Sequence, residues 1–211
     1  MKTMKLLFTL LFIAAFATVG FGQNIVGSAH DFSADAWNSS GEICIACHTP
    51  HNASTTVNTA LWNHDETVAT FTLYSSSTLD ATDVGQPTGV SKLCLSCHDG
   101  TVALDSYGGA TGTTFMGTVN SDATFGIDLS NDHPIGFTYD VALAAADDGL
   151  FNPTTTASGL GAEIDDDMLF GATNDQMECS SCHDVHDAEN NVSLLRKVNS
   201  ASALCLTCHN K

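Results

Sequence analysis

The chain has 211 residues, of which 24 are Asp or Glu and only six are Lys or Arg, so its formal net charge is −18 at pH 7. This excess of negative charge excludes electrostatic binding to nucleic acid or to anionic lipid, because both are negatively charged themselves. The length fits one compact domain or two small ones.

Residues 1–22 have the pattern of a secretory signal peptide. Two lysines precede an apolar run over residues 6–16, and small residues come before an expected cleavage site at Gln23. A membrane anchor is the alternative, but the run is short for a bilayer span and threonine interrupts the apolar segment. We therefore expect an exported chain of residues 23–211 without a later membrane span.

All eight cysteines fall into four C-x-x-C pairs, and a histidine follows each pair directly. The cysteines are Cys44, Cys47, Cys94, Cys97, Cys179, Cys182, Cys205 and Cys208, and the histidines are His48, His98, His183 and His209. C-x-x-C-H is the attachment signature of haem c, in which both thiols bond to the porphyrin and the histidine binds the iron. Disulfides, zinc sites and thioredoxin-like redox pairs also use paired cysteines, but none requires this histidine. The sequence therefore predicts four haems c, and covalent attachment outside the cytoplasmic membrane agrees with export.

Five further histidines are candidates for the sixth coordination position of the irons. They are His30, His51, His64, His133 and His186. Methionine is the other common ligand, and it would raise the haem potential. The methionines after the signal peptide are Met116, Met168 and Met177. Because spare histidines outnumber the predicted haems, we expect bis-histidine ligation at all four.

The motifs repeat in a pattern that predicts two di-haem units, residues 23–130 and 131–211. The first and third motifs continue as C-x-x-C-H-x-x-H, whereas the second and fourth share LCLxCH. Two histidines three residues apart cannot bind opposite faces of one iron, so the second histidine is expected to serve the other haem of its unit. The expected pairs are therefore His51 with His98, and His186 with His209.

The first and third haems then need ligands from elsewhere in the chain. We assign His30 and His133 to them and keep His64 as an alternative distal ligand. His30, near the start of the exported chain, is also the best candidate to bind a haem of a neighbouring subunit.

The segments CIACHTPHN, LCLSCHDGT, NDHPIG, CSSCHDVH and LCLTCH together resemble the multihaem c-type cytochromes with doubled C-x-x-C-H motifs. Four haems on this length resemble the OmcE-type tetrahaem cytochromes of the outer cell surface, and the resemblance covers nearly the whole exported chain. It implies a homopolymeric extracellular filament in which haems of neighbouring subunits are in contact.

The fold class expected is mostly coil with short helices at the haem motifs and a few short strands, organised around four stacked haems. Helical turns are expected around residues 43–48 and 203–209, and strands over residues 70–74 and 135–139. Aromatic residues are expected to pack on the porphyrins or in an ordinary core: Trp37, Trp62, Phe71, Tyr74, Phe115, Phe125, Phe137 and Tyr139. The acidic run at residues 165–167 is either a divalent-cation site or a polar loop.

Three functions are compatible with these motifs. The chain is expected to transfer electrons as the subunit of a conductive filament at the cell surface, or alternatively as a soluble, monomeric periplasmic carrier that meets other redox proteins. A small reductase is the third possibility, but it would need a five-coordinate iron. Bis-histidine irons have no open position for a substrate, so we do not expect an enzyme.

Overall fold

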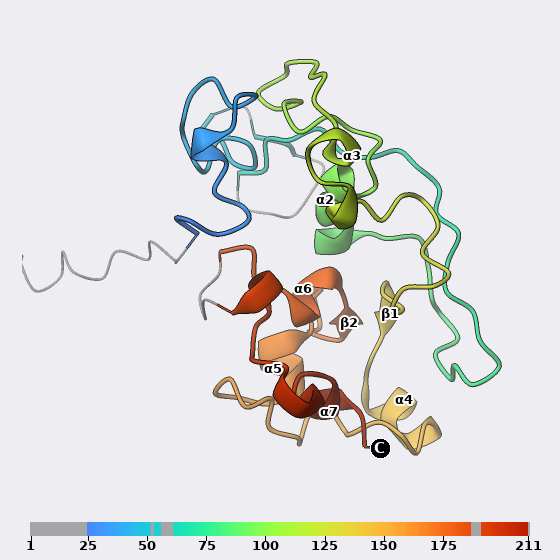
Figure 1. Ribbon diagram of the computed structural model, residues 1–211. Coiled ribbons are helices and arrows are strands. Elements are labelled where there is room, and N and C mark those ends of the chain that lie inside the picture. Colours follow the sequence, from blue (N-terminus) through green and yellow to red (C-terminus); the bar gives the residue numbers. More distant parts are fainter. Residues whose placement is uncertain (1–24, 52, 56–60, 187–190, 211) are drawn as a thin grey trace, which may run out of the picture.

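The computed structural model describes residues 25–51, 53–55, 61–186 and 191–210. Most of these residues are coil between short helices, which confirms the expected mostly coil architecture (Figure 1). The helices are α2 (Gly89–His98), α3 (Met116–Val119), α4 (Val141–Ala146), α5 (Ile164–Met168), α6 (Cys179–Cys182) and α7 (Cys205–Cys208), with 3-10 turns η1 (Phe32–Ala34), η2 (Ser121–Ala123), η3 (Val192–Leu194) and η4 (Ser200–Ser202). The long linkers are rich in Gly, Ser, Thr and Asp, which favour turns over helix interiors. No described helix has the length and apolar character needed to cross a membrane.

Three of the four cysteine motifs lie on helices. The second motif ends α2, and α6 and α7 each span one cysteine pair, as expected for the last motif. The first motif forms a turn without a helix, in which the His48 amide donates to the Cys44 carbonyl over 2.8 Å. In every case the histidine comes at the end of a tight backbone turn, which holds both thiols and the ring within one short segment.

The strands are shorter than the sequence suggested. β1 (Phe137–Thr138) pairs antiparallel with β2 (Gln176–Met177), so the strand expected at residues 135–139 is present in part. Residues 70–74 contain only an isolated parallel bridge between Thr72 and Asp128. The Gly85 amide donates a hydrogen bond to the Gly136 carbonyl over 3.0 Å, which connects the linker before α2 to the segment that leads into β1.

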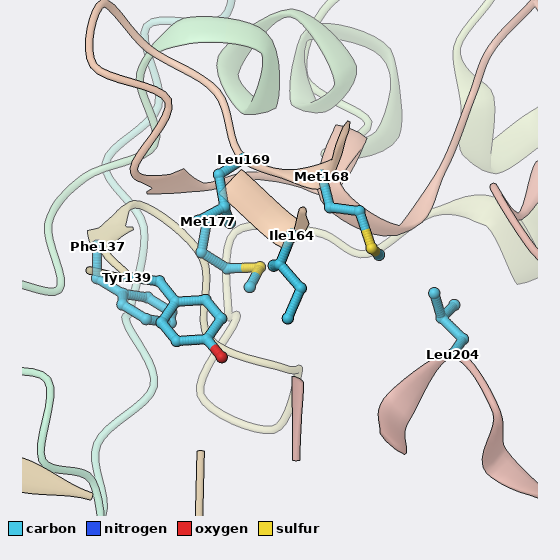
Figure 2. Packing of buried hydrophobic residues seen from close by; sticks show 7 residues of the cluster. All are labelled: Phe137, Tyr139, Ile164, Met168, Leu169, Met177 and Leu204. Atoms are coloured by element: carbon cyan, nitrogen blue, oxygen red, sulfur yellow. The ribbon is translucent and has the colours of Figure 1, made fainter. Parts of the chain in front are cut away.

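The larger apolar core lies between the β1–β2 pair, α5 and α7 (Figure 2). Its buried members are Phe137, Tyr139, Ile164, Met168, Leu169, Met177 and Leu204. The Tyr139 hydroxyl donates to the Phe151 carbonyl over 2.6 Å, so the one polar atom of this ring is satisfied. Two of the three methionines considered as iron ligands are thus apolar core residues.

A smaller core holds α2 in place. Leu95, on α2, packs with Phe71 and Leu129, all three of them buried. On another side of the helix, the Ser96 hydroxyl accepts the Thr67 amide and donates to the Lys92 carbonyl. These contacts fix the helix that carries the second motif against Leu129 and against the linker at residues 67–71.

Candidate functional site

The second and third cysteine motifs meet directly. The thiols of Cys94 on α2 and Cys179 on α6 are hydrogen-bonded, which raises the pKa of Cys94 well above its usual value and lowers that of Cys179. The Glu178 carboxylate accepts the Ser91 amide over 2.9 Å, and the Ser91 hydroxyl accepts the Cys179 amide over 2.9 Å. This pair of bonds holds the start of α6 against α2.

The other neighbouring motifs also approach one another through their cysteines. Burial raises the pKa of Cys97 to about 12, and the nearby Cys47 of the first motif contributes to this shift. Burial likewise raises the pKa of Cys208 to about 11, and Cys182 of the third motif adds to it. Successive motifs are therefore neighbours in space, in the order in which they follow one another in the chain.

The row of motifs has two exposed ends. Cys44, the first cysteine, and Cys205, in the last pair, are exposed, whereas the other six are partly enclosed. Figure 1 shows α2, α6 and α7 following one another from the upper to the lower part of the molecule. The geometry places two motifs in the interior of the row and one at each end.

Three of the four motif histidines face a spare histidine across a nearly constant gap. The ring centroids are 6.1 Å apart for His30 and His98, 6.3 Å for His48 and His186, and 6.2 Å for His133 and His209. Since a metal–nitrogen bond is about 2.0 Å long, two imidazoles on opposite sides of one iron have centroids roughly 6.2 Å apart. The three ring pairs therefore fit six-coordinate haem irons.

Backbone carbonyls orient several of these rings through Nδ1. The Nδ1 atom of His98 lies 2.7 Å from the Ala123 carbonyl oxygen, that of His133 lies 2.9 Å from the Pro134 oxygen, and that of His183 lies 2.9 Å from the Ser193 oxygen. An imidazole that donates through Nδ1 keeps the Nε2 lone pair for a metal, and histidine ligands are usually held this way. The bonds thus leave Nε2 of each ring available.

The surroundings of His30 favour its neutral form. Burial and, to a smaller extent, the nearby His98 ring together lower the pKa of His30 to about 4, while the Val185 carbonyl acts in the opposite direction. The ring is therefore unprotonated at neutral pH, as a metal-binding imidazole must be.

The ring pairs differ from the pairs expected from sequence spacing. His98 faces His30 instead of His51, and His209 faces His133 instead of His186. Spacing along the chain shows which neighbouring histidines cannot share an iron, but it carries no information on which distant segment comes close. His30, considered as a ligand for a neighbouring subunit, lies beside a ring of its own chain.

The remaining candidate histidines have different surroundings. His64 is 4% exposed, and its two ring nitrogens lie 2.7 Å from the Asp65 carbonyl oxygen and 3.0 Å from that of Ala103. A neutral ring can donate to only one of these carbonyls, and Nε2 also lies 3.7 Å from the Cys97 thiol, so His64 contacts the second motif. His51 is exposed, and among the described side chains His183 has no ring partner at the spacing of the other three pairs.

A cavity of about 430 Å³ opens between the second and third motifs. Cys94, His98, Cys179, His183 and His30 all line it. Most of the remaining wall is apolar, with Leu95, Leu129, Ile135, Val185 and Leu194 among its residues. An apolar space with thiols and imidazoles at its wall fits a porphyrin, because the macrocycle is apolar and its attachment points are these groups.

Five of the eight aromatic residues named above lie at this site or in the apolar cores, whereas Phe115 is 41% exposed and Trp37 packs on Phe32. Phe125 packs on the His98 ring at 5.4 Å, and Trp62 lies edge-on to His48 at 6.3 Å. Phe71, Phe137 and Tyr139 belong instead to the two cores. The buried Trp62 Nε1–H has no acceptor in the described part of the chain, so it is a free donor next to the first motif.

The acidic run at residues 165–167 is part of α5. The Asp167 carboxylate accepts the Ser158 hydroxyl and, over 2.8 Å, the Ala162 amide. No cluster of three or more His, Cys, Asp or Glu side chains suited to a metal ion occurs in the described ranges. The Asp167 carboxylate therefore stabilises the turn before α5 as a hydrogen-bond acceptor.

The few described basic side chains are bound within the chain. Lys92 pairs with Glu66 at 3.0 Å, Arg196 donates to the Ser180 carbonyl and lies over the Phe170 ring, and Lys197 donates to the Ser158 carbonyl over 2.6 Å and to the Thr207 hydroxyl over 2.9 Å. They do little to offset the large excess of acidic residues, so the molecule keeps a strongly negative surface.

Comparison with known proteins supports this chemistry. Residues 172–211, which contain the third and fourth motifs, match the family model described as the doubled CXXCH motif. No curated protein matches the chain. The doubled motif is one of covalent haem c binding, so it supports a multihaem c-type cytochrome, with electron transfer as the function that such motifs suggest.

Proposed function

We propose that this chain binds four haems c in a row and transfers electrons along it. The observation that carries the proposal is that the hydrogen bonds from the Ser91 amide to Glu178 and from the Cys179 amide to the Ser91 hydroxyl hold the second motif against the third. The thiols of the other successive motifs are near enough to shift each other's pKa. Haems attached at such points have neighbouring edges, and electrons pass most readily between cofactors at short separation. Haem c supplies reversible one-electron chemistry at its iron when bound.

The histidine pairs favour electron transfer over catalysis. Three motif histidines have a second imidazole at the distance that fits the opposite face of an iron. An iron with two imidazole ligands has no vacant position for a substrate, so these sites are suited to accept and donate electrons only. We therefore propose a carrier rather than an enzyme.

The haem count is tested on the protein matured in an exporting host that attaches haem c. Intact-mass spectrometry is expected to show four haems added to a chain cleaved before Gln23, with an absorption spectrum of low-spin iron. A Cys94→Ser/Cys97→Ser variant is expected to carry one haem fewer. A wild-type mass without haem would overturn the proposal, and a mass with fewer than four would correct the count.

We further propose that copies of the chain assemble into a conductive filament, through the exposed ends of the row at Cys44 and Cys205. The sequence resemblance to OmcE-type cytochromes supports assembly, and the alternative is a monomeric periplasmic carrier. Because each copy is strongly acidic, repulsion between copies should weaken assembly at low ionic strength. Electron microscopy of shed material at rising salt is expected to show more and longer filaments. Monodisperse monomers at high concentration and high salt would favour the alternative.

A further inference from the structure

The short segment after the third motif reaches back to the first and second motifs. His186 lies with its ring centroid 6.3 Å from that of His48, and the two ring planes are nearly parallel, at 14°. Offset-stacked rings also have centroids about 4.5–7 Å apart, and the same distance fits two imidazoles on one iron. His186 belongs to the second predicted unit and His48 to the first.

Residues 184–186 are held in a shape that presents the ring. The Asp184 carboxylate accepts the His186 amide over 3.0 Å, and the same oxygen lies 3.7 Å from His186 Nδ1. At 3.7 Å the carboxylate is beyond hydrogen-bond distance of Nδ1, but it lies on the Nδ1 side of the ring, which leaves Nε2 for a metal. Between these two residues, the Val185 carbonyl accepts a hydrogen bond from the His30 ring, which in turn faces His98.

We infer that His186 is the distal iron ligand at the first motif, opposite His48, so that residues 184–186 join the two halves of the molecule through the ligands of their haems. This inference rests on the proposed function, since it requires haem at the first motif. The same segment supports the distal ligand of the second motif through the Val185 carbonyl. Neither of the first two haems then has its full ligand environment until the chain beyond the third motif is in place.

The ring planes give this pairing a spectroscopic signature. The His48 and His186 planes differ by 14°, whereas those of His30 and His98 differ by 62°, and those of His133 and His209 by 74°. In low-spin ferric haem, nearly parallel imidazoles split the iron d orbitals strongly and give a rhombic electron paramagnetic resonance signal. Strongly crossed imidazoles give a highly anisotropic signal instead, so the haem of the first motif can be identified by its rhombic signal.

The test is the full-length holoprotein with His186→Ala, compared with wild type and with Val192→Ala. Val192 is an apolar residue of the same region that is 86% exposed, so it controls for a local effect of substitution. We expect His186→Ala to add one high-spin haem to the number in wild type, to remove the rhombic signal of the first-motif haem and to leave the highly anisotropic signals intact. Added imidazole should restore the low-spin state, and Val192→Ala should match wild type.

Several outcomes would overturn the inference. One is a rhombic signal that survives His186→Ala. Another is the loss of a highly anisotropic signal in its place, which would assign His186 to another haem. If His186→Ala does not mature, His186→Met decides, because methionine ligation should raise the potential of one haem while all stay low spin. A wild-type spectrum that lacks either signal class would also refute the pairing. Wild-type mass without haem refutes the proposed function, whereas a normal haem count with an unaffected His186→Ala spectrum refutes only this inference.

Discussion

Glu178→Ala should weaken the contact between the second and third motifs and lower the free energy of unfolding. The Glu178 carboxylate accepts the buried Ser91 amide of α2, and it caps α6 in a reciprocal pair of hydrogen bonds with Ser181. Leaving the Ser91 amide without an acceptor costs about 1–3 kcal/mol, since Ser91 is 0% exposed. Loss of the helix cap costs about 1 kcal/mol. Because one side chain makes both interactions, the two effects overlap, and we expect a loss of roughly 2–3 kcal/mol in the free energy of unfolding.

The measurement is guanidinium unfolding of the holoprotein at pH 7, followed by both circular dichroism and Soret absorption. Glu178→Gln is the matched control, because its amide oxygen can still accept the Ser91 amide. The reasoning predicts that Glu178→Gln stays close to wild type while Glu178→Ala unfolds at lower denaturant. Equal stability of Glu178→Ala and wild type would refute it, and so would a Glu178→Gln variant as unstable as Glu178→Ala.

The same residue predicts a pH dependence. Burial raises the pKa of Glu178 above its usual value of 4.5, and the hydrogen bonds from Ser91 only partly oppose this. The folded state therefore binds this proton more tightly than the unfolded state, so stability falls as the pH rises from about 4.5 through the folded pKa. Glu178→Gln lacks this titration, and its stability relative to wild type should increase across that interval and then level off. A difference that is constant from pH 4 to pH 8 would contradict the shift.

Three other changes test the site. Gly89→Ala should destabilise the holoprotein by about 1 kcal/mol or more. The reason is that Gly89 has φ +51° and an added Cβ would lie 2.6 Å from Glu178 Oε1. Unchanged thermal unfolding would contradict this expectation. Trp62→Phe removes the free indole donor beside His48. Spectroelectrochemical titration should show one haem potential lowered by up to about 60 mV, which is a tenfold change in a one-electron equilibrium. Identical potentials in the variant and wild type would exclude a hydrogen bond from this donor to the haem. Chemical removal of the haems should abolish cooperative unfolding in circular dichroism, since the two apolar cores are small, and a native-like transition of the haem-free chain would show that the cores suffice.

The local chemistry of this protein can be predicted from its sequence because the attachment motif is itself local. Two thiols and a histidine within five residues determine where a porphyrin can be bound, and every cysteine of the chain belongs to such a motif. The mostly coil architecture follows from linkers rich in Gly, Ser, Thr and Asp, which is also local information. The short helices at the last motif and the position of β1 could be predicted for the same reason.

The tertiary structure decided which histidine rings come together. A distal ligand must approach the opposite face of the haem, so it comes from whichever segment packs there and not from a fixed spacing to the motif. The C-x-x-C-H-x-x-H pattern predicts that His186 and His183 serve different irons, and the His186 ring lies by His48, more than a hundred residues earlier. His64 is buried beside the Ala103 carbonyl and, in the described part of the chain, does not face a motif histidine, and folding rather than local sequence placed it there. Sequence determined which residues can bind haem, whereas long-range packing determined which of them meet, because contacts between distant segments depend on the whole path of the chain.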